Sequence, residues 1–248
     1  MQDTFRLNDR IYHMVHFDNL ENIFARRTLL SKHALEQEGI KLRSIALDSV
    51  QKLRERIFIW DALINMFRPL HSYVPFYFAK RTPMLYVQYA RGLQHDIIFL
   101  EVSSRILKEP GVIFTDGNAT NQQLSDQNDQ KVYIIPASLS KEQKRYYSLG
   151  NIPLGTNLNR STFFAHWKFL QHLNWEVIYG ENRFDGNAEK KRIKHAEILV
   201  PDRLPLERLV GISAMSMWQV EKVNDLAKRC GLEGCIPRAV SKPDLYFP

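Results

Sequence analysis

The sequence has little cysteine and no long apolar run, and both absences restrict the class of protein. Cys230 and Cys235 are the two cysteines among 248 residues, too few for a structural zinc site and badly spaced for a redox pair. We therefore expect reduced thiols and no metal site. No stretch approaches the roughly 18 apolar residues of a membrane span, and the N-terminal residues lack the apolar core of a signal peptide. These absences predict a cytoplasmic protein with no membrane partner.

Acidic residues are also in the minority, whereas the apolar content is ordinary. The chain has 34 Lys and Arg against 27 Asp and Glu, a formal charge of +7, which favours a polyanionic partner. Its hydrophobic content of 44%, with 11 Gly and 11 Pro, is typical of a globular protein. Internal repeats, low-complexity tracts and linkers are missing. We expect one domain over residues 1–248.

The first regular element predicted by the pattern is a strand that leads directly into a helix. Residues 11–17 alternate as a strand does, and Asp18 is placed to cap a helix over about 19–27, with Glu21 completing a capping box. His13 and His16 are an odd number of positions apart, so in a strand they face opposite sides. A metal site that uses both histidines is therefore disfavoured.

The rest of the chain predicts a mixture of strands and helices. Residues 32–57 are polar and basic, typical of a helix and loop on the surface, and Asp116, Gly117 and Asn118 form a turn signature. Residues 121–160 and 180–190 are irregular, and Phe163 to Leu170 recur at helical spacing. The other predicted strands are at 73–78, 96–102, 112–115, 209–214 and 236–240. One further helix is predicted to begin at Pro83 and another to span about 217–229.

The stretch 194–201 is the most informative part of the chain. Ile198 and Val200 alternate as in a half-buried strand, which places Glu197 on the opposite, polar face. The basic residues Lys190, Lys191, Arg192 and Lys194 precede it, so an anionic partner could be held beside this carboxylate. Taken alone, the pattern favours a strand that opens with a solvated glutamate. Because a side chain on a polar face contributes little packing, we expect Glu197→Ala to leave the fold intact even where it abolishes activity.

Four segments, in this order, resemble the DarT family, the toxins of DarT–DarG toxin–antitoxin systems. They are Tyr12-His13-x-x-His16-x-Asp18-Asn19-Leu20-x-x-Ile23, Val74-Pro75-Phe76-Tyr77-Phe78-x-x-Arg81-x-Pro83-Met84-Leu85-Tyr86, Phe114-Thr115-Asp116-Gly117-Asn118-Ala119 and Ala196-Glu197-Ile198-Leu199-Val200. Residues 242–247 resemble the aromatic C-terminus of the family.

The resemblance implies an α+β fold of the ADP-ribosyltransferase type, with central mixed or antiparallel sheets flanked by helices around an NAD cleft. It also implies transfer of ADP-ribose from NAD+ to a thymine or guanine base of single-stranded DNA, with a DarG-like macrodomain antitoxin as partner. A carboxylate near the ribose suits this chemistry, because it stabilises developing positive charge and can accept the proton of the base. Glu197 matches the catalytic glutamate of the family.

The same resemblance implies roles for residues elsewhere in the chain. Arg54 is the best match to the catalytic arginine, although Arg56 is close to it in sequence. The implied DNA contacts are Lys190, Lys191, Arg192 and Lys194. The implied NAD+ contacts are His13, Met14, Val15, Asn19, Asn22 and Leu30.

Two segments depart from the family pattern and leave alternatives open. Residues 57–69 are more apolar than the usual connection, and residues 121–160 are long, so the target base is undecided between thymine and guanine. The acceptor is also open, because RNA or protein would fit the same NAD chemistry. The third alternative is a catalytically inactive nucleic-acid-binding module, which the presence of both Glu197 and Arg54 disfavours.

Overall fold

The structure, a computed structural model, describes residues 7–122, 131–136, 160–180 and 186–248. Its centre is a sheet of eight strands in the order β13-β12-β6-β1-β5-β10-β7-β9. These strands are β1 (Arg10–His16), β5 (Tyr73–Tyr77), β6 (Ile97–Ser103), β7 (Ile113–Thr115), β9 (Phe163–Phe164), β10 (Glu197–Pro201), β12 (Leu209–Ala214) and β13 (Ala239–Ser241). The pairings are antiparallel except for β12 with β13, so the sheet is mixed, as predicted.

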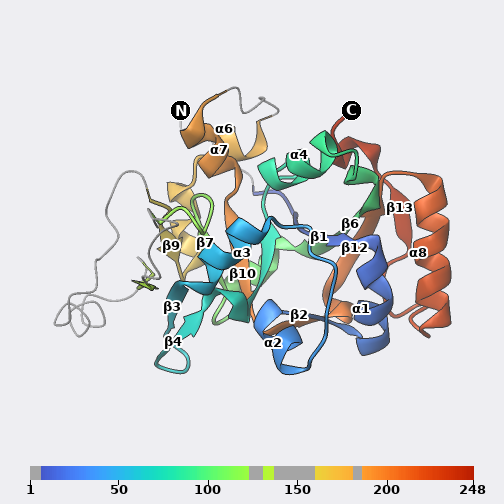
Figure 1. Cartoon of the computed structure of the whole chain (residues 1–248), viewed down its shortest axis with the longest axis horizontal. Coiled ribbons are helices and arrows are strands. Elements are labelled where there is room, and N and C mark those ends of the chain that lie inside the picture. Colours follow the sequence, from blue (N-terminus) through green and yellow to red (C-terminus); the bar gives the residue numbers. More distant parts are fainter. Residues whose placement is uncertain (1–6, 123–130, 137–159, 181–185) are drawn as a thin grey trace.

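Two small sheets and seven α-helices accompany the central sheet in the described ranges. The small sheets join β2 (Thr28–Leu30) to β11 (Arg203–Pro205), and β3 (Ile57–Asp61) to β4 (Met66–Pro69) and β8 (Val132–Ile134). The α-helices are α1 (Leu20–Arg26), α2 (Lys32–Gln37), α3 (Asp48–Glu55), α4 (Pro83–Ala90), α6 (Trp175–Tyr179), α7 (Ala188–Lys194) and α8 (Met217–Arg229). Figure 1 shows α8 beside β13 and β12, and α6 and α7 near the opposite end of the sheet. No helix in the described ranges is long and apolar enough to cross a membrane.

Strand alternation divides the core between the two faces of the central sheet. One face packs Val74, Phe76, Ile198 and Val200 into the largest apolar cluster, which includes residues of α1 and α8. The other face has two smaller clusters, one around Phe99 and Tyr246 and one that includes Leu199 and residues of β3. These two clusters lie toward opposite ends of the same face of the sheet.

A proline in the middle of the sheet interrupts the ladder between β1 and β5. β1 pairs with β6 along its whole length, but it pairs with β5 only where Tyr12 faces Tyr77. The next facing position on β5 is Pro75, which has no N–H to donate to a neighbouring strand. Instead, its carbonyl oxygen accepts a hydrogen bond from Nδ1 of His13, 2.7 Å away. The two central strands therefore part at Pro75.

Most elements in the described ranges confirm the sequence-based predictions and two do not, while most of the irregular stretches predicted at 121–160 and 180–190 lie outside the described residues. Asp18 does not cap a helix: its N–H donates to Nδ1 of His16 at 3.1 Å, and a 3-10 turn (Phe17–Asn19) precedes α1. The aromatic run predicted as a helix begins with β9, which pairs with β7, and continues as a 3-10 helix (Trp167–His172). The stacked rings of Phe114 and Phe164, 5.2 Å apart, provide the packing that favours a strand here.

Candidate active site

Glu197 begins strand β10, and the structure buries it instead of exposing it. Its cross-strand neighbour on β5 is Tyr77, which in turn faces Tyr12 on β1, so the three side chains lie in a row on one face of the sheet. Glu197 is only 2% exposed. The prediction of a solvated glutamate was therefore wrong, because α3 and the turn that follows β7 cover this end of the strand.

Arg54 supplies the positive charge that makes this burial tolerable. It lies in the last turn of α3, and its Nη1 donates to Oε2 of Glu197 at 2.8 Å. Both side chains are buried, with exposed fractions of 9% and 2%. A buried carboxylate requires such a partner, because an unpaired charge in the interior is costly. Of the two arginines weighed from the sequence, Arg54 is the one that contacts Glu197.

The turn after β7 contacts the other oxygen of the carboxylate. The backbone N–H of Ala119 donates to Oε1 of Glu197 at 3.1 Å, and the backbone N–H of Glu197 donates to Oγ1 of Thr115 at 3.0 Å. Thr115 in turn donates to the carbonyl oxygen of Gly117 at 2.6 Å. The carboxylate is thus fixed at both oxygens, by a helix on one side and by a turn on the other.

Tyr77 is the buried neighbour of this pair. Burial and the adjacent Glu197 carboxylate raise the pKa of the Tyr77 phenol well above its usual value, and Arg54 opposes them. Its hydroxyl lies 3.6 Å from Sδ of Met84 on α4. The phenol therefore stays protonated at neutral pH. The position of Tyr77 next to Glu197 depends on the register of β5 with β10.

His13 lies where β1 and β5 part. Because the oxygen of Pro75 can only accept, Nδ1 of His13 carries the proton. Burial lowers the pKa of His13 to about 4, and the bond to Pro75 opposes that shift. The ring is therefore neutral at pH 7, and Nε2 keeps a lone pair that can accept a hydrogen bond. His13 and His16 face opposite sides, as predicted, because Tyr12 and Met14 pack into one cluster and Val15 into the other.

The remaining residues assigned to NAD+ by resemblance have different surroundings. Met14 and Val15 are buried in β1, just beyond the point where the ladder with β5 ends. Leu30 is buried in β2 opposite Arg203. Their roles toward NAD+ stay predictions.

The two asparagines assigned to NAD+ by resemblance differ in burial. Asn19 is buried in the 3-10 turn, and its amide exchanges two hydrogen bonds of 2.8 Å with the backbone of Arg43. Asn22 is exposed on α1 and accepts from Nε of Arg26 at 3.2 Å. Asn19 therefore anchors the segment that leads to α3, a contact that the sequence pattern did not indicate.

The basic run before Glu197 forms α7, and its four cations fall into two groups. Lys190 and Lys191 are exposed. Lys194 is buried, and its ammonium group donates to the carbonyl oxygen of Gly180. Arg192 is also engaged: Nε and Nη2 donate to the two oxygens of Glu189 at 2.8 and 2.7 Å, and Nη1 donates to Asp116 at 3.0 Å. In this structure, Lys194 and Arg192 make contacts within the protein, and the phosphate contacts assigned to the four cations by resemblance stay predictions.

Comparison with known proteins gives the family. The profile described as "ssDNA thymidine ADP-ribosyltransferase, DarT" matches residues 12–138 and 132–247. A DNA ADP-ribosyl transferase from Thermus sp. (strain 2.9) is 28% identical over 254 residues, 100% of both chains.

Solved structures agree with the sequence comparison. Thermus sp. 2.9 DarT in complex with ADP-ribosylated ssDNA superimposes with a TM-score of 0.74 at 26% identity over 100% of both chains. The complex of that protein with NAD+ gives a TM-score of 0.69 at 25% identity, over 98% of this chain and 100% of that one. This similarity confirms the predicted α+β fold of the ADP-ribosyltransferase type.

One similar protein carries a second enzyme in the same chain. A DNA ADP-ribosyl transferase-DNA ADP-ribosyl glycohydrolase fusion protein from Thermosipho africanus is 25% identical over 138 residues, which cover 55% of this chain and 34% of that protein. The match of the family profile, in contrast, runs through nearly the whole chain, and it includes Glu197, Arg54 and the turn between them. The chain belongs to the DarT family.

Proposed function

We propose that this protein is a toxin that transfers ADP-ribose from NAD+ to a thymine base of single-stranded DNA and releases nicotinamide. The observation that carries the proposal is the buried Glu197–Arg54 pair at the start of a central strand, in a chain that matches DarT along nearly its full length. Thymine is preferred over guanine because the matching family profile is described as thymidine-directed.

Polar side chains from β1, α3 and β10 suit NAD+. A dinucleotide offers ribose hydroxyls and pyrophosphate oxygens, which need an acceptor and a positive charge respectively. His13 provides the acceptor, since its neutral ring bonds Pro75 through Nδ1 and leaves Nε2 available. Arg54 provides the charge, and Glu197 occupies only one of its five N–H donors in the bond described above.

Glu197 performs the central step. NAD+ supplies an ADP-ribosyl group whose bond to nicotinamide breaks with positive charge developing on the ribose. A carboxylate that is fixed at both oxygens can stabilise that positive charge without first reorganising. Such preorganised groups are the most effective form of electrostatic stabilisation. The remaining lone pairs of Glu197 can accept the proton that the attacking base must lose. Arg54 holds the carboxylate in place during this step.

The surface near the site suits a polyanionic acceptor. Lys190 and Lys191 are exposed on α7, the element directly before the strand that begins with Glu197. We assign phosphate contacts to these two lysines, in agreement with the formal charge of +7. The contact is with the backbone of the DNA strand, so these lysines contribute affinity and do not select the base.

The biological setting follows from the chemistry of the mark. Modification of DNA bases is harmful to the cell that makes the enzyme, so a second activity must remove it. The Thermosipho africanus relative carries a glycohydrolase in the same chain. We assign to this protein a DarG-like macrodomain partner of that activity, and a cytoplasmic location, where NAD+ and single-stranded DNA are available.

The test is incubation with labelled NAD+ and a panel of single-stranded oligonucleotides that differ in their thymine and guanine content, with RNA and protein as parallel acceptors. The matched variant is Glu197→Gln, which keeps the size of the side chain and an oxygen for the Ala119 N–H but removes the charge. We expect label on thymine-containing DNA that the variant loses. Label confined to RNA or protein would contradict the proposed acceptor, and full activity of Glu197→Gln would contradict the proposed chemistry.

A further inference from the structure

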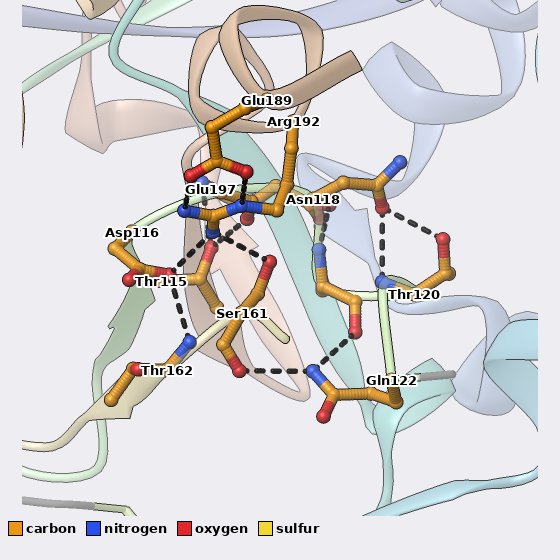
Figure 2. A network of polar contacts seen from close by, with 12 residues as sticks. Thr115, Asp116, Asn118, Thr120, Gln122, Ser161, Thr162, Glu189, Arg192 and Glu197 are labelled. Atoms are coloured by element: carbon orange, nitrogen blue, oxygen red, sulfur yellow. Dashed lines mark hydrogen bonds and ion pairs between the residues drawn. The ribbon is translucent and has the colours of Figure 1, made fainter. Parts of the chain in front are cut away.

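Arg192 is surrounded by acceptors that come from three parts of the chain. Nε and Nη2 form a two-pronged contact with Glu189 on the same helix, and Nη1 lies 3.0 Å from Asp116 and 3.3 Å from Oγ of Ser161. The side chain is 10% exposed. Figure 2 shows this group, the Arg192 network, with Asp116 and Ser161 pointing at one end of the guanidinium and Glu189 at the other.

The backbone of α7 approaches the turn after β7 very closely at this point. The N–H of Asn118 donates to the carbonyl oxygen of Arg192 at 2.9 Å. A Cβ atom placed on Gly117 would lie 2.4 Å from Nη1 of Arg192 and 3.0 Å from its carbonyl oxygen. Only glycine allows this approach, so the turn and the end of the helix are fitted to each other.

The same turn holds the Glu197 carboxylate. Ala119 donates its backbone N–H to Oε1, and Thr115 links the backbone N–H of Glu197 to the carbonyl oxygen of Gly117. Residues 115–119 are therefore bonded to Arg192 on one side and to Glu197 on the other (Figure 2). A displacement of the turn would move the donor that orients the carboxylate.

Charge argues against a phosphate contact for Arg192. Two carboxylates, those of Glu189 and Asp116, surround one guanidinium, so the group as a whole is negative. Releasing the guanidinium to DNA would leave Asp116 without its cation close to the turn. Lys190 and Lys191 on the same helix are exposed and carry no such cost.

We propose that Arg192 is a positioning residue: it fixes the turn of residues 115–119 and thereby the orientation of the Glu197 carboxylate. The proposal rests on the proposed function for its effect on rate. Its effect on the turn does not depend on the acceptor or on NAD+. The two consequences can be measured separately.

The kinetic test compares Arg192→Ala and Arg192→Lys with wild type on NAD+ and single-stranded DNA. A displacement of a catalytic group by about 1 Å can lower the rate roughly 100-fold. We expect a loss of kcat of that order in both variants, with KM for either substrate and the salt dependence of DNA binding unchanged. Lysine fails because it keeps the charge but cannot contact Glu189 and Asp116 as a planar fork does.

A phosphate contact predicts a different pattern. Arg192→Lys would then retain activity, and Arg192→Ala would weaken DNA binding and reduce the salt slope by about one. Lys191→Ala is the positive control for such a change in slope. Arg229→Ala removes an exposed arginine near the end of α8, and is the matched control expected to leave kcat unchanged. The phosphate-contact pattern in the Arg192 variants would overturn the proposal.

Gly117→Ala tests the same contact without altering any charge. Its methyl group must displace Arg192 or the turn, so we expect reduced kcat with an unchanged salt slope. Amide hydrogen exchange measures the stability of the turn directly. The Ala119 amide should exchange at least about tenfold faster in Arg192→Ala and Gly117→Ala than in wild type, while the amides of β6 keep their protection.

The outcomes separate the two proposals. A wild-type protein that labels no DNA contradicts the proposed function, whereas faster exchange at Ala119 in the variants still supports the positioning role. Wild-type exchange at Ala119 in Arg192→Ala and Gly117→Ala, with the β6 amides protected as in wild type, overturns the positioning role whatever the acceptor proves to be.

Discussion

Removal of the Glu197 carboxylate is expected to destabilise the protein as well as inactivate it. The sequence alone suggested a solvated side chain whose truncation would leave the fold intact. The structure contradicts this, because Glu197 is 2% exposed and is the partner of an Arg54 side chain that is 9% exposed. In Glu197→Ala the guanidinium stays buried without its counter-charge, and the N–H of Ala119 loses its acceptor.

The expected magnitude follows from buried ion pairs in general. Removing one partner of such a pair costs about 3–5 kcal/mol, most of which is the penalty of the charge left behind. For a chain of this size, that corresponds to a fall in Tm of roughly 6–20 °C. Glu197→Gln should lose less, since its amide oxygen can still accept one hydrogen bond. Replacing both partners, as in Arg54→Met with Glu197→Leu, should recover much of the stability, because no buried charge remains.

Thermal and urea unfolding of wild type, Arg54→Met, Glu197→Leu and the double variant would form a complete cycle, with Glu197→Ala and Glu197→Gln measured beside it. The reasoning predicts strong coupling between the two positions. A Glu197→Ala protein within about 1 kcal/mol of wild type, with additive effects in the double variant, would refute the buried pair. The practical consequence is that Glu197→Gln is the cleaner variant for assigning catalysis.

Two further predictions concern stability away from the ion pair. Burial lowers the pKa of both His13 and His195 from 6.5 to about 4. Between these two values the unfolded chain binds more protons than the folded one, so the free energy of unfolding falls as the pH decreases. Urea unfolding should show a loss of about 2 kcal/mol per ring between pH 7.5 and 4.5, and equal midpoints at the two pH values would contradict the prediction. Gly211→Ala places a methyl carbon 2.5 Å from Nη1 of Arg10 and 3.0 Å from the buried Glu101 carboxylate. Thermal unfolding should therefore show a loss of about 1–3 kcal/mol in the free energy of unfolding. An unchanged Tm would contradict this prediction and show that the sheet around Gly211 can relax.

Local patterns predicted much of the fold because the information they need lies within a few residues. Helix α8 spans Met217–Arg229 as predicted, since Ser216 and Gln219 form a capping box at its start. Thr82 and Pro83 likewise mark the start of α4. The alternation of Ile198 and Val200 correctly identified β10, but not the burial of its other face, which carries Glu197 and Leu199.

The environment of Glu197 could not be predicted in this way, because it is made by distant segments. Arg54 and Glu197 are separated by 143 positions, and only the tertiary fold brings α3 over the start of β10. Arg192 illustrates the same limit: a basic run suggests a DNA surface, but the acceptors Asp116 and Ser161 belong to other segments. Two local signals were present in retrospect, a proline within a strand at Pro75 and a glycine within the turn at Gly117.

The sheet order also has a consequence for the timing of synthesis. β10 lies between β5 and β7, so a strand made late in translation is inserted between two that were made much earlier. A chain still on the ribosome has neither the carboxylate nor the strand that holds it until residue 197 has been added. The carboxylate and the strand that holds it therefore join the sheet together, after both neighbouring strands have been made.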